Sequence, residues 1–118
     1  MGVIEENLSY FLQKHGEIYE AYENYGKLLH TKGGPLDEKT RWLIKVALST
    51  ACQNPYSLTT HIRKALKSGC TPDEIEHAIL LCAPTAGFPK MMEALLTFRE
   101  DVKKNTVTPL PFDSPAQP

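Results

Sequence analysis

The residues that could do chemistry gather in one stretch, TACQNPYSLTTHIRKALKSG, at residues 50–69. His61 follows Leu58 by three residues and precedes Ala65 by four, so on a helix all three side chains share one face. A histidine on an apolar face is either a core residue with one satisfied hydrogen bond or a proton donor and acceptor in a pocket between two helices. The residues alone leave both interpretations open.

Charged and aromatic side chains flank this histidine. Arg41, Lys45, Arg63 and Lys64 are the nearby cations. Most such charges belong to a solvated helix face, but a carboxylate ligand near His61 would need one of them. Trp42 is either a core anchor or an interface residue.

The cysteines offer little chemistry by their spacing. Cys52, Cys70 and Cys82 are odd in number and form no C-x-x-C pair. We therefore expect buried thiols in a reducing cytoplasm, with no disulfide framework. With His61 and His77 they show no recognisable zinc spacing, so we predict no metal site.

Length and charge limit the partners. The chain has 118 residues, 42% of them hydrophobic and 23% charged, with a net charge of −1. This composition is typical of one globular domain and lacks a basic nucleic-acid-binding patch. The start, MGVIEENLSYFL, lacks the basic region of a signal peptide, and no apolar run reaches membrane length. We expect a cytoplasmic protein that binds neither nucleic acid nor membrane.

The elements that must position these residues are helices. Apolar residues at helical spacing predict helices over residues 4–14 and 17–30, before the KGGP turn at 32–35. Asp37 is the predicted N-cap of a third helix. Asn54 and Pro55 begin a fourth, which Gly69 ends.

The remainder of the chain continues in the same way. Thr71 and Glu74 predict a capping box for a fifth helix that runs through Cys82. APTAGFP at 83–89 interrupts it, and a sixth helix is expected from about Pro89 to Lys104. The fold prediction is one compact all-α domain of about six helices over residues 1–104, with a central antiparallel hairpin of helices three and four. Residues 105–118 form a predicted proline-rich, extended tail.

The region from the third helix to the sixth resembles the carboxymuconolactone decarboxylase family. The similarity covers residues 36 to about 96, and its motifs come in order without gaps. It rests on LDEKTR at 36–41 and then on Pro55, Leu58, His61-Ile62, Ala65-Leu66, Gly69, Thr71, Glu74-Ile75, Gly87 and Pro89. The resemblance implies an alkylhydroperoxidase D-like helical fold and a homo-oligomer, a trimer or hexamer, in which helices of one subunit complete the pocket of another.

One branch of that family, alkylhydroperoxidase D, uses a glutamate and the motif C-x-x-C-x-x-x-H. Aligned on His61, its cysteine positions fall on Asn54 and Ser57, and its glutamate falls on Trp42. Neither serine nor asparagine can form a disulfide, so dithiol chemistry is excluded at this site.

The decarboxylase branch fits the turn better, since it has a similar asparagine, proline, leucine and histidine run without cysteines. Its tyrosine before the glycine-proline segment is Thr85 here, and its frequent acidic residue is Ser57. The resemblance implies loss of carbon dioxide from a small carboxylated lactone without a cofactor. It makes His61 the candidate acid, Arg41 or Arg63 the carboxylate anchor, and Ser57 and Trp42 further substrate-binding positions.

Three functions follow from these observations. The first is a cofactor-independent decarboxylase, or related lyase, that acts on a small organic acid. The second is a non-catalytic, oligomeric binding or scaffold member of the family, because Trp42, Ser57 and Thr85 stand where functional residues stand elsewhere. The third is a thiol-dependent peroxidase that uses Cys52 alone, and we rank it last.

Overall fold

The structure is a computed structural model that describes residues 2–107. Every regular element within this range is an α-helix, which confirms the all-α prediction. The chain divides into two compact units, residues 1–35 and residues 36–118. None of the described helices has the length and apolar character needed to cross a membrane.

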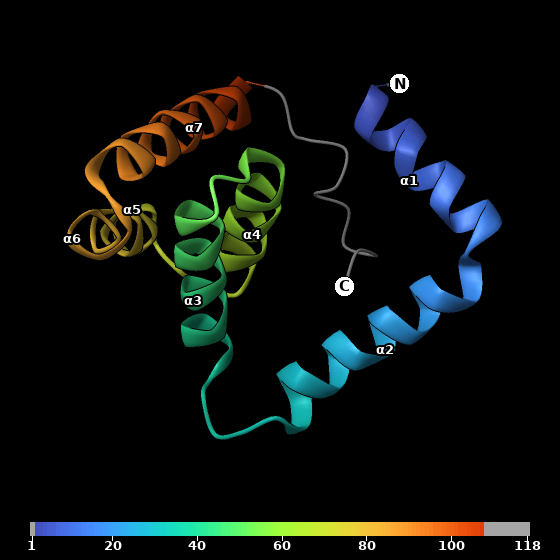
Figure 1. Cartoon of the computed structure of the whole chain (residues 1–118). Coiled ribbons are helices and arrows are strands. Elements are labelled where there is room, and N and C mark those ends of the chain that lie inside the picture. The colour runs from blue at the N-terminus through green and yellow to red at the C-terminus, as the bar shows by residue number, and fades with distance from the viewer. Residues whose placement is uncertain (1, 108–118) are drawn as a thin grey trace. The chain divides into compact units, whose positions relative to one another are not determined.

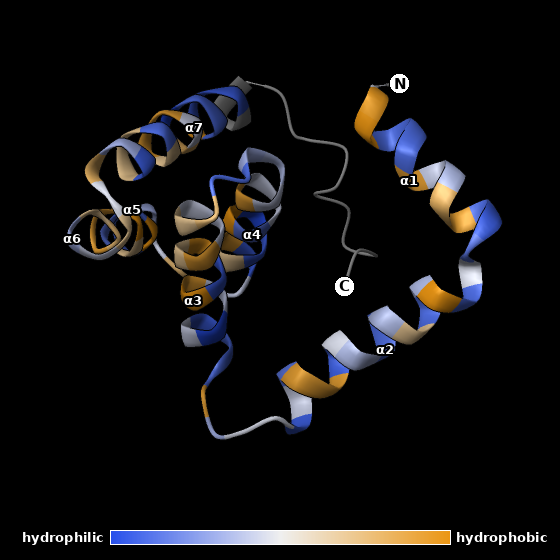
Figure 2. Ribbon diagram, viewed as in Figure 1, coloured by the Kyte–Doolittle hydropathy of each residue, from blue (hydrophilic) through white to orange (hydrophobic). Residues whose placement is uncertain are grey.

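The first unit consists of α1 (Val3–Lys14) and α2 (Gly16–Lys32) (Figure 1). The two helices meet at His15, where the ring of Phe11 lies 5.4 Å from the His15 ring and 6.3 Å from the Tyr19 ring, centroid to centroid. Neither helix has a buried residue. Hydrophobic residues recur along both (Figure 2), and Tyr22 is 68% exposed. Two helices of this length therefore form no core of their own.

The second unit contains the core. It comprises α3 (Glu38–Ala51), α4 (Pro55–Lys67), α5 (Pro72–Leu80), α6 (Ala83–Ala86) and α7 (Phe88–Val107). Helix α3 packs on α4 and α5, and α7 packs against α3, α4, α5 and α6. The largest fully buried aliphatic side chains come from three of these helices: Val46, Leu58, Ile62, Ile75 and Ile79. Their burial supplies the main apolar stabilisation of this unit.

Helices α3 and α4 form an antiparallel hairpin and lie side by side in Figure 1. Trp42 contacts Lys64 across it, and Ser49 contacts Ser57. In each pair the two residues lie equally far from Gln53 along the sequence. This is the pairing expected when two antiparallel helices are joined by a turn at that residue. The predicted central hairpin is confirmed.

Local capping fixes where the helices of this unit begin. The carboxylate of Asp37 accepts a hydrogen bond from Thr40 N–H, and Asn54 Oδ1 accepts one from Ser57 N–H. Hydrogen bonds from the side chain and then from the N–H of Thr40 lower the Asp37 pKa. Thr71 and Glu74 form the predicted capping box, and the hydrogen bond from Thr71 N–H lowers the pKa of Glu74. These caps satisfy amide groups that a helix leaves without an internal partner.

Boundaries differ from the sequence prediction near the prolines. Helix α5 ends at Leu80 and not at Cys82, and the short α6 occupies part of the predicted break. Proline is tolerated in a first turn, and Pro84 and Pro89 lie in the first turns of α6 and α7. Helix α7 reaches Val107, three residues into the predicted extended tail, whose remainder at 108–118 lies outside the described residues. The single domain over 1–104 stays a prediction.

Candidate active site around His61

The hairpin brings two serines to one ring nitrogen of His61. Ser49 Oγ lies 2.7 Å from His61 Nδ1 and 2.9 Å from Ser57 Oγ, and Ser57 Oγ lies 3.4 Å from the same nitrogen. Ser49 is only 5% exposed, whereas Ser57 and His61 are half-buried. His61 therefore has a strong hydroxyl partner across the hairpin and a weaker one on its own helix.

The ring of His61 also lies against Trp42. The two ring centroids are 5.9 Å apart at an interplanar angle of 38°, and the Lys64 ammonium lies 5.1 Å from the Trp42 ring centroid. Trp42 thus contacts an imidazole and makes a cation–π interaction with Lys64. Of the residues predicted for the site, the structure brings Trp42, Ser57 and His61 together.

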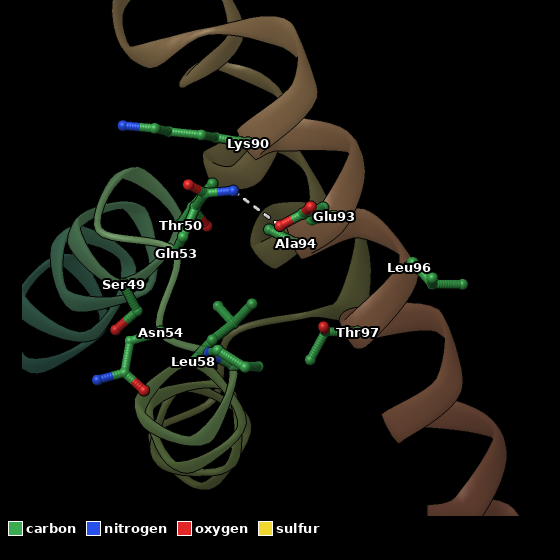
Figure 3. Close-up of a pocket in the computed structure, with 11 residues that line it drawn as sticks. Ser49, Thr50, Gln53, Asn54, Leu58, Lys90, Glu93, Ala94, Leu96 and Thr97 are labelled. Atoms are coloured by element: carbon green, nitrogen blue, oxygen red, sulfur yellow. Dashed lines mark hydrogen bonds between the residues drawn. The ribbon is translucent and has the colours of Figure 1, made fainter.

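A cavity of about 330 Å³ opens beside this cluster, between the α3–α4 turn and α7 (Figure 3). Its polar lining comes from Ser49, Thr50, Gln53, Asn54, Lys90, Glu93 and Thr97. Pro55, Leu58, Ala94 and Leu96 supply the apolar lining. Ser49 is thus shared by the cavity and the histidine cluster, while His61 is not one of the described lining residues. The volume suits a small organic molecule.

The turn at the edge of the cavity holds a strained residue. Gln53 has φ 52°, the left-handed conformation in which glycine is the usual residue. Asn54 N–H donates to Ser49 C=O and Gln53 N–H to Thr50 C=O, which is the Schellman pattern. The Gln53 side chain then donates from Nε2 to Glu93 Oε2 at 2.8 Å, the dashed line in Figure 3. This bond ties the turn to α7.

The two arginines named from the sequence are engaged elsewhere. Arg63 is 6% exposed and pairs through a terminal nitrogen with Asp101 of α7, at 2.9 Å. Arg41 donates to the Leu36 carbonyl at 2.6 Å, beside the start of α3. Both are thus bound to protein groups, and neither is among the described residues that line the cavity.

The cysteines lie apart from the cluster. The prediction of buried thiols is confirmed for Cys70 and Cys82 and is wrong for Cys52, which is exposed because it caps the C-terminal end of α3. Burial raises the pKa of the Cys70 and Cys82 thiols. A buried thiol with a raised pKa is a poor nucleophile. Within residues 2–107, no three His, Cys, Asp or Glu side chains group closely enough to hold a metal ion.

Ser49 is the residue that the sequence interpretation missed. A serine within an apolar helix carries no signal of its own, because most such side chains bond to the preceding turn. The sequence signal that could have found it is the pairing of residues across the hairpin. That pairing places Ser49 opposite Ser57, and Ser57 lies one helical turn from His61. Lys90 and Glu93 were missed because α7 meets the turn only through tertiary packing.

Comparison with known protein families identifies a family for this chain. The family model for the carboxymuconolactone decarboxylase family matches residues 16–100. The match begins in α2, earlier than the similarity recognised from residue 36 onward. A comparison with curated proteins found no significant match. Since the matched region spans well over half of the 118 residues, the chain belongs to the carboxymuconolactone decarboxylase family.

Proposed function

We propose that this protein is a cofactor-independent decarboxylase, or related lyase, of a small carboxylated lactone or similar organic acid. The observation that carries the proposal is the placement of His61, bonded through Nδ1 to a serine that also lines a cavity. Histidine can hold and release a proton near neutral pH, which general acid catalysis requires. Membership of the family supports the substrate class.

The reaction needs three things from the protein. As carbon dioxide leaves, the electron pair of the broken carbon–carbon bond spreads into the conjugated lactone carbonyl, where donors must stabilise the charge. Apolar surroundings weaken the solvation of the departing carboxylate. An acid must then protonate carbon. The cavity offers Asn54 and Thr97 as donors, Leu58 and Ala94 as apolar walls, and His61 through its bonded serine as the proton source.

A cation must hold the substrate in place. Because Arg63 is buried in its ion pair with Asp101, that role would require the pair to break, at a large cost in stability. Lys90 lines the cavity and is half-buried, so we propose it as the carboxylate anchor. The alternative anchors are Lys64, which contacts Trp42, and Arg41, which would first have to release the Leu36 carbonyl.

The test is carbon dioxide release from carboxymuconolactone by the purified full chain. A peroxide-consumption assay with a dithiol reductant runs beside it, and Lys90→Met is the matched variant. We expect carbon dioxide release without peroxidase turnover, and a raised KM in Lys90→Met because the anchor is lost. Peroxide consumption without carbon dioxide release would overturn the proposal.

A second candidate is a non-catalytic binding member of the family. It is favoured by the engagement of both arginines with protein groups, which leaves lysines as the cations near the cluster. This function predicts that small carboxylates bind at the cavity without being consumed. Binding detected by calorimetry, with intact ligand recovered afterwards, would support it over the decarboxylase.

We also propose that the protein is a homo-oligomer, a trimer or hexamer, in the cytoplasm. Apolar side chains on α3 support assembly, since Ile44 is 43% and Leu48 54% exposed. Three free cysteines support a reducing compartment. Light scattering at micromolar concentration tests the assembly, and a mass near 13.2 kDa would contradict it.

A further inference from the structure

We propose that Ser49 is the group that passes the proton between His61 and a substrate in the cavity, which makes it a catalytic residue. The inference rests on the proposed function and assigns the reacting hydroxyl within it. Ser49 belongs both to the cavity lining and to the hydrogen-bonded cluster. His61 is bonded to it at 2.7 Å through Nδ1 and is not one of the described residues that line the cavity.

The geometry favours Ser49 over Ser57 for this transfer. Ser57 Oγ is 3.4 Å from His61 Nδ1, too long for efficient proton transfer, and Ser57 is not among the described lining residues. Ser49 Oγ has the short bond to the imidazole, and its 5% exposure keeps bulk water from competing. Ser57 Oγ, 2.9 Å from Ser49 Oγ, holds that hydroxyl in place as a positioning residue.

The step balances without any added reactant. The electron pair left by the departing carbon dioxide forms the new carbon–hydrogen bond with the proton of the Ser49 hydroxyl. Ser49 Oγ takes a proton from Nδ1 of the His61 imidazolium at the same time. The serine ends as a hydroxyl and the imidazole ends neutral, and a solvent proton recharges the imidazole before the next turnover. No covalent intermediate forms on the protein.

The transfer can be isolated from decarboxylation by running it in reverse. By microscopic reversibility, the group that protonates carbon also removes that proton from the product. The probe is therefore the decarboxylated lactone in deuterium oxide, with deuterium uptake at the protonated carbon followed by NMR. Ser49→Ala is compared with Thr59→Ala, which removes a hydroxyl from the same hairpin that donates to the Pro55 carbonyl.

We expect wild type and Thr59→Ala to catalyse exchange equally, and Ser49→Ala to lose on the order of 10²–10⁴ in exchange rate. Ser49→Thr keeps the hydroxyl and should recover most of that rate, which separates chemistry from packing. Circular dichroism confirms that each variant is folded. Exchange that survives in folded Ser49→Ala, or that is missing in wild type, would overturn the inference. A last outcome is that deuterium exchange depends on Ser49 while no carbon dioxide is released from carboxymuconolactone. That result would support the proton transfer through Ser49 and refute only the proposed decarboxylase function.

Discussion

The indole of Trp42 lies against the imidazole of His61, with ring centroids 5.9 Å apart. Trp42 is the single tryptophan of the sequence, so its fluorescence reports on this histidine without interference from another indole. An imidazolium withdraws electron density from an excited indole more strongly than a neutral imidazole does. The contact therefore gives a direct optical signal for the protonation state of the proposed acid.

We predict that tryptophan emission falls when the His61 imidazole is protonated on acidification. Lys64 also contacts the indole, and it is retained in both variants that are compared with wild type. The transition should vanish in His61→Gln and persist in His77→Gln, whose histidine is exposed on α5. If the fluorescence transition survived in folded His61→Gln, protonation of His61 would not be what quenches Trp42.

The buried pair of Arg63 and Asp101 ties α4 to α7. We predict that Arg63→Met lowers the free energy of unfolding by about 3–5 kcal/mol, since it removes the cation that faces a buried carboxylate. Asp101→Leu in the same chain should restore much of the loss, because two apolar side chains then replace two charges. Urea unfolding measures both effects. A raised KM with unchanged stability would instead support the substrate-anchor role predicted from the sequence.

The left-handed conformation of Gln53 gives a third prediction. Gln53→Gly relieves the backbone strain, and the free energy of unfolding should rise by roughly 0.5–1 kcal/mol despite the loss of the Glu93 bond. Gln53→Ala loses the same bond without that relief, so its stability should fall slightly. If Gln53→Gly and Gln53→Ala were equally stable in urea, the left-handed backbone at residue 53 would not be strained.

The capping box makes stability depend on pH. The hydrogen bond from Thr71 N–H lowers the folded-state pKa of Glu74 below its usual value of 4.5. The stabilisation is therefore complete above that value and is lost as the pH falls through the lower, folded-state pKa. Glu74→Gln keeps a cap acceptor but does not titrate, so its urea stability should fall less than that of wild type between about pH 5 and pH 3. If wild type and Glu74→Gln lost the same urea stability over this pH range, the pH dependence would not come from Glu74.

The sequence predicts the helix starts well because capping is local. Asp37, Asn54 and Thr71 each bond to an amide three residues onward, so a short window of sequence contains the whole interaction. Gly69, at φ 101°, ends α4 by the same local logic. Antiparallel pairing of α3 and α4 follows from the short turn between them.

The site is harder to predict because its partners are distant in sequence. Arg63 has the appearance of a solvated cation until α7 places Asp101 against it, 38 residues onward. Ser49 gains its importance only from the hairpin register and from a cavity that α7 completes. Tertiary packing decides both, and neither hydrophobic periodicity nor capping encodes it.

The central claim is that His61 supplies the proton for decarboxylation, and His61→Gln tests it most directly. Turnover of carboxymuconolactone and the melting temperature are measured on the same folded variant. We predict that carbon dioxide release falls by about 10²–10⁴ while the melting temperature stays within a few degrees of wild type. Unchanged specific activity of the folded fraction, together with a stability loss of about 1–3 kcal/mol, would show that His61 is only a core histidine and would contradict the claim.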